Sequence, residues 1–344
     1  MDRPSLMNRR QLIGATGTAA TFMALASRAH ARPFVPALGP RCRVLIVNDL
    51  AGDIDALFAT VHALLSPSTE IRTIVGTQAG FSGETASQAA AIGNEIIKIM
   101  HLAKQVTVHS GATAKLASTD TPDRSPGVQA IIDEAMRTDT SLPLYITVGG
   151  GLTEVASALL IEPAIAEKFT LVWIGGGAYP DGGKGDTNFN IDPVAAQFVF
   201  NKSKVPLWQV PSDAYAQCQV SASELQAFVA PRGAIGKWLH QKLIESSATL
   251  GRKYRINTGE TWTLGDSPLV LLTALTHWGP SGRSRPFRYE RMSSLFDERL
   301  APLLKSDGSY EARTDGRRIR VYKTLDTRLL FGDFFTKMRL QSTR

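Results

Sequence analysis

The segment 41–65, RCRVLIVNDLAGDIDALFATVHALL, decides how this chain folds. A nearly continuous apolar run ends at Asn48 and Asp49, and an amphipathic stretch follows within a few residues. Such a run predicts a strand buried on both faces, as in a parallel sheet, and the stretch after it predicts a helix. Two more carboxylates, Asp53 and Asp55, stand in the loop between them, where many α/β proteins place a glycine-rich phosphate-binding turn.

The same alternation of apolar runs and amphipathic stretches continues along the chain. Strands are expected at 42–47, 70–76, 105–109, 142–148, 169–175 and 205–210, with a late one at 318–323. Helices are expected at 54–66, 84–103, 126–138, 152–162, 192–202 and 233–249, with another from about 327. Strands separated by helices favour a parallel sheet covered on both faces. The linking loops are short, so residues 32–344 are predicted to form a single doubly wound α/β domain with a mostly parallel sheet flanked by helices.

Residues 1–31 have the pattern of an export signal. Arg9 and Arg10 precede a short apolar stretch, and Ala29-His30-Ala31 gives a small-x-small cleavage site. The paired arginines predict a twin-arginine (Tat) signal peptide, and hence a periplasmic protein. An N-terminal membrane anchor is the alternative, but the stretch is short and weakly apolar for a bilayer span.

Charge and cysteine content limit the choice of partners. The formal charge of +7 falls to +4 without residues 1–31, and the remaining basic residues are scattered except in GRRIRVYK near the end. Nucleic-acid binding usually needs a concentrated basic face, so we expect neither a nucleic-acid partner nor membrane contact after signal cleavage. Cys42 and Cys218 match no metal spacing and are expected to be buried, although an oxidising compartment would allow them to pair.

The acidic loop predicts a cation site. In an open parallel sheet, ligands gather at the carboxyl ends of the strands. Asp49, Asp53 and Asp55 would repel phosphate there, whereas Ca²⁺ and Mg²⁺ prefer such oxygen ligands. The alternative is that Asp53 or Asp55 caps the following helix. Three acids within seven residues favour a metal.

Later segments offer further polar groups at strand ends. Gly149-Gly150-Gly151 follows one strand, a long polar loop carrying Asp186, Asn188 and Asn190 follows another, and Asp266 precedes an apolar helix. Glycines allow close approach of the backbone to a ligand. Each signal is weak alone, because the glycines could form a tight turn and Asp266 could be an N-cap.

Taken together, these segments resemble a known family. NDLAGDIDAL, GGGLTEVASALLIEPAIAEKF, WIGGGAYPDGGKGDTNFNIDPVAAQFVF and GDSPLVLL are similar, in this order, to segments of the inosine–uridine preferring nucleoside hydrolases, over roughly residues 43–278. The tail, RIRVYKTLDTRLLFGDFFTKM, resembles an exported bacterial branch of that family. The resemblance implies a Rossmann-like nucleoside hydrolase fold, a small-molecule nucleoside substrate and possible homo-oligomers.

The resemblance also implies a calcium-dependent site. It assigns Ca²⁺ coordination to Asp49, Asp55, Asp266 and the backbone carbonyl of Gly149, and activation of water to Asp53. Thr77, Asn188 and Asn190 fall at positions that contact the sugar.

This sequence departs from the family pattern at several site positions. Val47 stands where an aspartate is usual, and the adjacent Asp-Asp pair is split into Asp53-Ile54-Asp55, so the base and the ligand could be exchanged. Thr77 replaces an asparagine, Asn188 a glutamate, and Gly265 the histidine that can protonate a leaving base.

The resemblance implies hydrolysis of the N-glycosidic bond of ribonucleosides to free base and ribose. One alternative is a periplasmic Ca²⁺-dependent nucleoside- or sugar-binding protein with little turnover. Another is a hydrolase of a different ribosyl-type N-glycoside. A phosphohydrolase with Asp49 as nucleophile would want a second aspartate where this chain has Ala51.

Overall fold

The computed structural model describes residues 35–80, 83–253, 255–276 and 293–341. The predicted signal peptide lies outside these residues. The core is an eight-stranded sheet with the order β3-β2-β1-β4-β5-β6-β12-β9, in which only β9 runs antiparallel to its neighbour. Its strands are β1 (Cys42–Asn48), β2 (Thr69–Gly76), β3 (Thr107–Ser110), β4 (Leu144–Gly149), β5 (Phe169–Ile174), β6 (Leu207–Val210), β9 (Leu295–Leu300) and β12 (Arg318–Thr324). The predicted mostly parallel sheet is confirmed.

Strand β1 shows why its apolar run has no polar alternation. All seven of its residues are buried. Val44 and Ile46 enter one hydrophobic cluster, while Leu45 and Val47 enter the cluster on the opposite face. Successive side chains of a strand point to opposite faces, so a strand covered on both sides needs apolar residues at every position.

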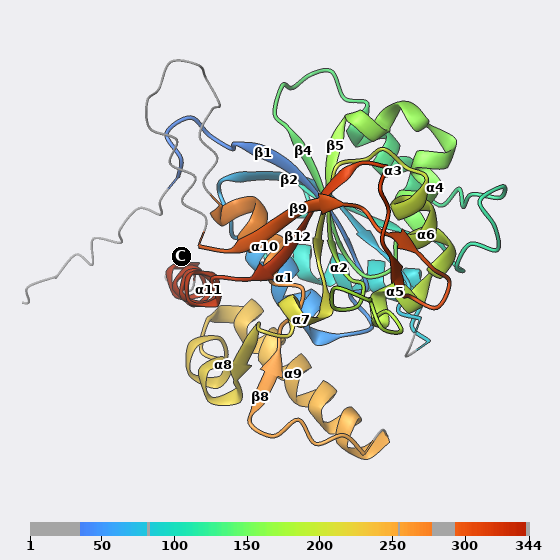
Figure 1. Cartoon of the computed structure of the whole chain (residues 1–344). Helices are drawn as coiled ribbons and strands as arrows, with labels where there is room; N and C mark the ends of the chain where they lie inside the picture. Colours follow the sequence, from blue (N-terminus) through green and yellow to red (C-terminus); the bar gives the residue numbers. More distant parts are fainter. Residues whose placement is uncertain (1–34, 81–82, 254, 277–292, 342–344) are drawn as a thin grey trace, which may run out of the picture. The chain divides into compact units, whose positions relative to one another are not determined.

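Helices cover both faces of the sheet (Figure 1). On one side lie α1 (Ile54–Leu64), α2 (Ala86–Ile99), α9 (Gly233–Lys253), α10 (Pro268–Val270) and α11 (Thr327–Gln341). On the other lie α3 (Pro126–Ala135), α4 (Thr153–Ile161) and α6 (Pro193–Asn201). This arrangement is the predicted doubly wound α/β fold.

Shorter elements complete the chain. They are the 3₁₀ helix η1 (Pro163–Glu167), α5 (Thr187–Ile191), α7 (Ser212–Tyr215), α8 (Ala222–Phe228) and the π-helical turn η2 (Leu271–Leu275), with two small antiparallel pairs, β7 (Gln219–Ser221) with β8 (Thr261–Thr263) and β10 (Leu303–Leu304) with β11 (Tyr310–Glu311). Ser221 and Glu224 form a capping box at the start of α8.

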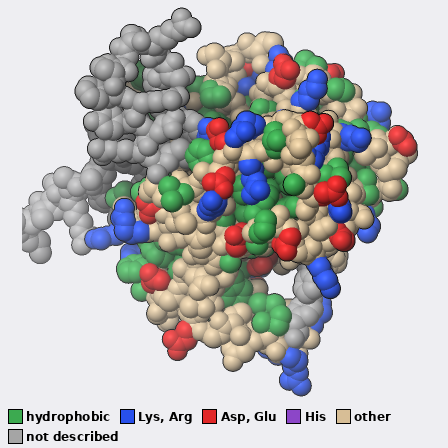
Figure 2. Space-filling model, in the orientation of Figure 1, with side chains coloured by type: hydrophobic (Ala, Val, Ile, Leu, Met, Phe, Trp, Pro, Cys, Tyr) green, Lys and Arg blue, Asp and Glu red, His purple; other side chains and the backbone are tan. Residues whose placement is uncertain are grey.

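The surface carries mixed charge. Figure 2 shows basic and acidic side chains interspersed over the displayed face, rather than a continuous basic patch. Cys42 and Cys218 are both buried free thiols, so this structure does not pair them. None of the helices in the described ranges is both long enough and apolar enough to cross a bilayer.

Candidate active site

The acidic loop lies at the centre of the sheet edge. β1 lies between β2 and β4, and its last residue, Asn48, is in register with Gly76 of β2 and Gly149 of β4. Backbone hydrogen bonds continue past the strand ends: Thr77 N donates to Asn48 O at 3.0 Å, and Asp49 N to Gly149 O at 3.2 Å. Three predicted site positions therefore meet at the carboxyl ends of adjacent strands.

Asp266 arrives at this point from a distant part of the chain. Its backbone N–H donates to Asp55 Oδ2 at 3.0 Å, although 211 residues separate the two. Its carboxylate lies directly against the backbone of Gly149, because a Cβ added to that glycine would lie 2.2 Å from Asp266 Oδ2. Any side chain at position 149 would displace Asp266. This requirement gives a structural reason for the glycine.

Burial raises the pKa of all four acids, and repulsion from neighbouring aspartates adds to this effect for Asp49, Asp55 and Asp266. Asp49 and Asp266 are buried, Asp55 is partly buried and Asp53 is exposed at its solvent edge. Burial raises the pKa of Asp49 and Asp55 well above the usual value, and neighbouring aspartates raise it further. Burial raises the pKa of Asp266 to about 7, and the surrounding protein also raises the pKa of Asp53.

The helix-capping alternative is correct for one of these acids. Asp53 is the N-cap of α1, and its Oδ1 accepts from Ile54 N at 2.6 Å. Asp55 Oδ1 accepts from its neighbour Ala56 N at 2.9 Å. Each carboxylate has a second oxygen, so capping does not prevent Asp53 from accepting a proton.

The donor chemistry of this cluster suits a hard cation. Four carboxylates and the backbone carbonyl of Gly149 are oxygen donors of the kind that Ca²⁺ prefers. Across the described ranges, however, no three Asp, Glu, His or Cys side chains are already arranged to hold a metal ion. The side chains would have to rotate towards a common cation. The charge of that cation would relieve the repulsion among the buried carboxylates.

The segment 186–190 is held by buried Asp186, the N-cap of α5. Its Oδ1 accepts from Gly176 N at 2.8 Å and from Phe189 N at 2.9 Å. The side-chain amides of the two predicted sugar contacts also hold this segment in place. Asn188 Nδ2 donates to Ile174 O, and Asn190 Nδ2 donates to Asp186 O. These bonds use the amide nitrogen of each side chain.

Thr77 is linked to an acid that sequence reasoning overlooked. Its hydroxyl donates to Glu154 Oε1 at 2.8 Å, and Ala112 N donates to the same oxygen at 2.9 Å. Glu154 is fully buried, and burial raises its pKa to about 7. Thr77 itself is only 1% exposed, so its expected contact with a substrate would need the chain around it to open.

Tyr215 lies beside the acidic cluster, although the sequence favours core packing for this residue over stacking on a base. Its hydroxyl donates to Asp186 Oδ2 at 3.1 Å. Its ring faces Gly265, because a Cβ added at that glycine would lie 3.2 Å from Tyr215 Cδ2. Burial and the charges of Asp186, Asp55 and Asp266 raise the pKa of Tyr215, so it is a neutral donor.

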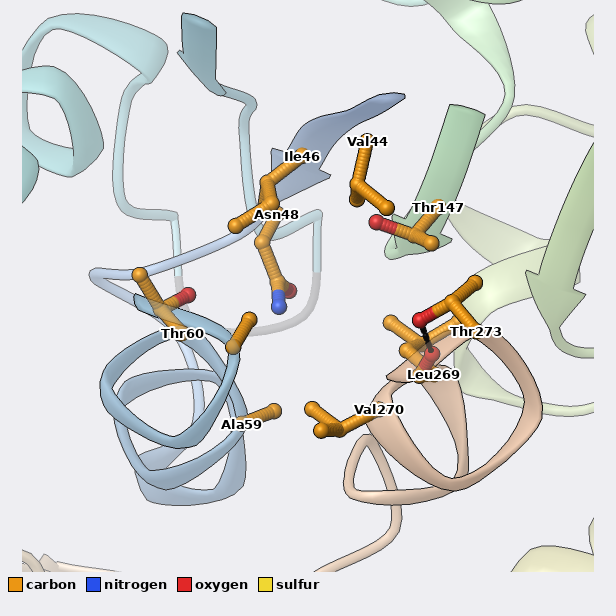
Figure 3. A pocket seen from close by; sticks show the side chains of 10 residues that line it. Val44, Ile46, Asn48, Ala59, Thr60, Thr147, Leu269, Val270 and Thr273 are labelled. Atoms are coloured by element: carbon orange, nitrogen blue, oxygen red, sulfur yellow. Dashed lines mark hydrogen bonds between the residues drawn. The ribbon is translucent and has the colours of Figure 1, made fainter. Parts of the chain in front are cut away.

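A small cavity of about 10 Å³ lies next to the aspartates, between β1, α1, β4 and α10 (Figure 3). Asn48 points into it from the end of β1, and Thr60 borders it from α1. Thr60 Oγ1 is buried without a hydrogen-bond partner among the described residues. Asn48 Oδ1 accepts from Asp49 N at 3.0 Å, so this side chain joins the cavity to the acidic loop.

Residues 44–304 match the family model described as inosine-uridine preferring nucleoside hydrolase. The chain belongs to this family. The inosine-uridine preferring nucleoside hydrolase of Crithidia fasciculata is 38% identical over 95 residues, which span 26% of this chain and only 27% of that protein.

Solved structures of nucleoside hydrolases share the fold. The purine-preferring ribonucleoside hydrolase from Gardnerella vaginalis has a TM-score of 0.65 at 18% identity, covering 88% of this chain and 100% of that one. The inosine-uridine preferring enzyme from Bacillus anthracis has a TM-score of 0.60 at 16% identity, covering 88% and 100%. The family and fold expected from the sequence are both confirmed.

Three departures from the nucleoside hydrolase pattern have visible structural consequences. Val47 is fully buried in the apolar cluster on one face of the sheet, so its side chain is part of the core. Gly265 packs closely against the ring of Tyr215 and the carboxylate of Asp55, because an added Cβ would lie 3.2 Å from Tyr215 Cδ2 and 3.1 Å from Asp55 Oδ2. The split between Asp53 and Asp55 places an exposed acid at the N-cap and a partly buried one against Asp266.

Proposed function

We propose that this protein hydrolyses the N-glycosidic bond of ribonucleosides, giving free base and ribose, at the cluster of Asp49, Asp53, Asp55 and Asp266. The observation that carries the proposal is the convergence of these four carboxylates at the carboxyl end of the central strand. Family membership supports the reaction class.

Asp49, Asp55, Asp266 and the carbonyl of Gly149 would hold the metal, for which we propose Ca²⁺. A bound Ca²⁺ would supply positive charge that orients the sugar hydroxyls and makes a water molecule more acidic. The buried position of Asp49 and Asp266 supports this role, because buried charges require compensation. The hydrogen bond from Asp266 N to Asp55 Oδ2 places Asp55 on the same side of the cluster.

Asp53 would accept the proton of the attacking water. It is the most accessible of the four acids, and its raised pKa makes it a stronger base than an ordinary aspartate. Cleavage of the glycosidic bond passes through a state resembling an oxocarbenium ion, which the neighbouring carboxylates would stabilise by their charge. Asn188 and Asn190 would orient the sugar from the 186–190 segment.

A calcium-dependent nucleoside or sugar binder with little turnover is the second candidate. It is favoured by the use of the Thr77 hydroxyl and the Asn188 and Asn190 amides in internal hydrogen bonds, which reduces the groups left for a substrate. Hydrolysis of another ribosyl-type N-glycoside would use the same aspartates.

Substitution Asp53→Asn separates these candidates. It keeps the side chain's shape and removes the proton acceptor, so ribose release from nucleosides should fall by about 10²–10⁴-fold. The matched control is Asp133→Asn, at an exposed position on α3, which should leave turnover unchanged. Full turnover in Asp53→Asn would contradict its assignment as the base, and a wild-type protein that binds nucleosides without releasing ribose would favour the binder.

A further inference from the structure

The hairpin β10–β11 packs against the long loop that follows β5. Tyr310 N of the hairpin donates to Asp181 O of the loop at 2.8 Å. The ring of Tyr310 stacks on that of Tyr179, with the ring centroids 4.5 Å apart. The two backbones also touch, because a side chain at Gly308 would collide with the backbone of Gly185. The hairpin therefore holds this loop at three points along its length.

Gln209, on β6, extends this contact to the end of β5. Its side chain is fully buried. Its Nε2 donates to the hydroxyl of Tyr310 at 2.8 Å and to Gly175 O at 2.9 Å, and its Oε1 accepts from the hydroxyl of Tyr179 at 2.8 Å. An amide nitrogen carries two hydrogens, so both are used. A side chain at Gly176 would collide with Gln209 Nε2 and the Tyr310 hydroxyl, so these groups fill the space beside the strand end.

The same end of β5 holds the segment 186–190. Gly176 N donates to Asp186 Oδ1 at 2.8 Å, and Asp186 is the N-cap of α5. Asn188, one of the two residues proposed to orient the sugar, donates from Nδ2 to Ile174 O at 2.9 Å. A displacement of this strand end would therefore move the sugar-orienting side chains as well.

We propose that Tyr310 is a positioning residue for the sugar of the substrate, acting through Gln209 and the end of β5 on the segment 186–190. The inference rests on the proposed nucleoside hydrolysis. Tyr310 lies beyond residue 304, where the match to the family model ends, so this role follows from the contacts of the fold. A segment that is already held in its binding geometry loses less conformational entropy when a ligand binds.

Tyr310→Phe isolates the hydroxyl. It keeps the ring that stacks on Tyr179 and removes an acceptor from Gln209 Nε2. Loss of one hydrogen bond between neutral groups should raise the KM for every nucleoside by about fivefold. The kcat should stay within about twofold of wild type, because the four aspartates keep their contacts. Tyr310→Leu removes the stacked ring too, so its KM should rise further.

A double-mutant cycle tests whether the hydroxyl acts through the segment 186–190. In a background that combines Asn188→Ala with Asn190→Ala, the side chains that the segment would present to the sugar are gone. Tyr310→Phe should then raise the KM by less than about twofold, because no contact is left for it to position. A purely structural role would give the same factor in both backgrounds.

Glu311→Gln is the matched control. Glu311 follows Tyr310 in the hairpin, and its carboxylate forms an exposed ion pair with Lys305 Nζ at 2.7 Å. Exposed pairs contribute little to stability, so the KM should not change. Thermal unfolding of each full-length variant verifies that it is folded. Affinity for inosine in the Asp53→Asn background, measured by equilibrium dialysis, gives a reading that does not depend on turnover.

The expected result is a raised KM and weaker inosine binding in Tyr310→Phe, both absent from Glu311→Gln and lost in the background without the two asparagines. An unchanged KM, a fall in kcat alone, or an equal rise in KM in that background would overturn the inference while leaving nucleoside hydrolysis intact. If the wild type releases no ribose but Tyr310→Phe weakens inosine binding, the proposed hydrolysis fails and the positioning role stands. If the wild type neither binds inosine nor releases ribose, both fail.

Discussion

At the scale of single residues, the proposed roles of base and metal ligand rest on the different surroundings of Asp53 and Asp55. Ile54 between them is buried in the core, so the carboxylates of Asp53 and Asp55 lie in different surroundings. Asp55 is tied to Asp266 N, whereas Asp53 caps α1 at the exposed edge. These contacts favour Asp55 as a ligand and Asp53 as the base.

Asp266→Asn should change stability in a pH-dependent way. Its pKa is about 7 in the folded protein against a usual 3.8, so folding stability falls as pH rises from about 4 through 7. In the presence of chelator at pH 7.5, removal of this charge should raise the unfolding free energy by on the order of 2–4 kcal/mol. At pH 4 the wild type and the variant should unfold alike in thermal melts.

Asp139→Asn is the control for this measurement. Asp139 is exposed, and its hydrogen bond with Arg137 lowers its pKa. The contribution of Asp139 to folding stability therefore has the opposite sign to that of Asp266: it increases as pH rises above the folded pKa of Asp139. If Asp266→Asn destabilises the chelated protein equally at pH 4 and pH 7.5, the buried charge of Asp266 is not what limits stability.

The sequence located the acids but not their partners. Asp49, Asp53 and Asp55 could be predicted because carboxylates next to an apolar run are conspicuous, whereas the role of Asp266 came only from the family resemblance. Glu154 and Tyr215 were not assigned to the site. Glu154 reads as a helix residue, yet the sheet brings it to Thr77, 77 residues away. Tyr215 meets Asp186 and Gly265 only after folding.

At the scale of elements, the packing of β1, α1 and α10 encloses the small cavity beside Asn48, the residue before the acidic loop. The cavity between them contains Thr60 Oγ1, which has no partner among the described residues, and Thr273, whose hydroxyl donates to Leu269 O at 2.6 Å. An unsatisfied buried hydroxyl is unfavourable, whereas a bonded one is not.

Thr60→Val and Thr273→Val should therefore change the unfolding free energy differently. Replacing the unpaired hydroxyl of Thr60 by a methyl group should raise the unfolding free energy by about 1–2 kcal/mol, because no hydrogen bond is lost. Thr273→Val, on the other side of the same cavity, should give no gain. Equal destabilisation by both substitutions in denaturant unfolding would show that Thr60 Oγ1 is hydrogen-bonded in solution, for example to a water molecule.

The elements that the sequence missed lie at the edges of the fold. β9, with the sequence LFDERL, is partly exposed and pairs antiparallel with β12 at the edge of the sheet. It needs no continuous apolar run, so the pattern that revealed β1 does not reveal β9. The predicted strand at 105–109 is seen as 107–110, another short edge strand with little burial.

At the scale of the whole molecule, we propose that residues 1–31 direct export through the Tat pathway to the periplasm, and that residues 32–344 form the single hydrolase domain. A reporter fused to residues 1–31 should be exported. It should be retained when Arg9→Lys and Arg10→Lys are combined, because the paired arginines are the proposed signal. Export in a strain that lacks the Tat translocon would contradict the proposal.

The central claim is that the four aspartates form a calcium-dependent nucleoside hydrolase site. The most direct test follows ribose release from inosine, uridine and a wider nucleoside panel while free Ca²⁺ is varied with a chelator, with Mg²⁺ as the comparison ion. We predict release that disappears on chelation and returns with Ca²⁺. Release that is indifferent to chelation, or no release from any nucleoside at saturating Ca²⁺, would contradict the account.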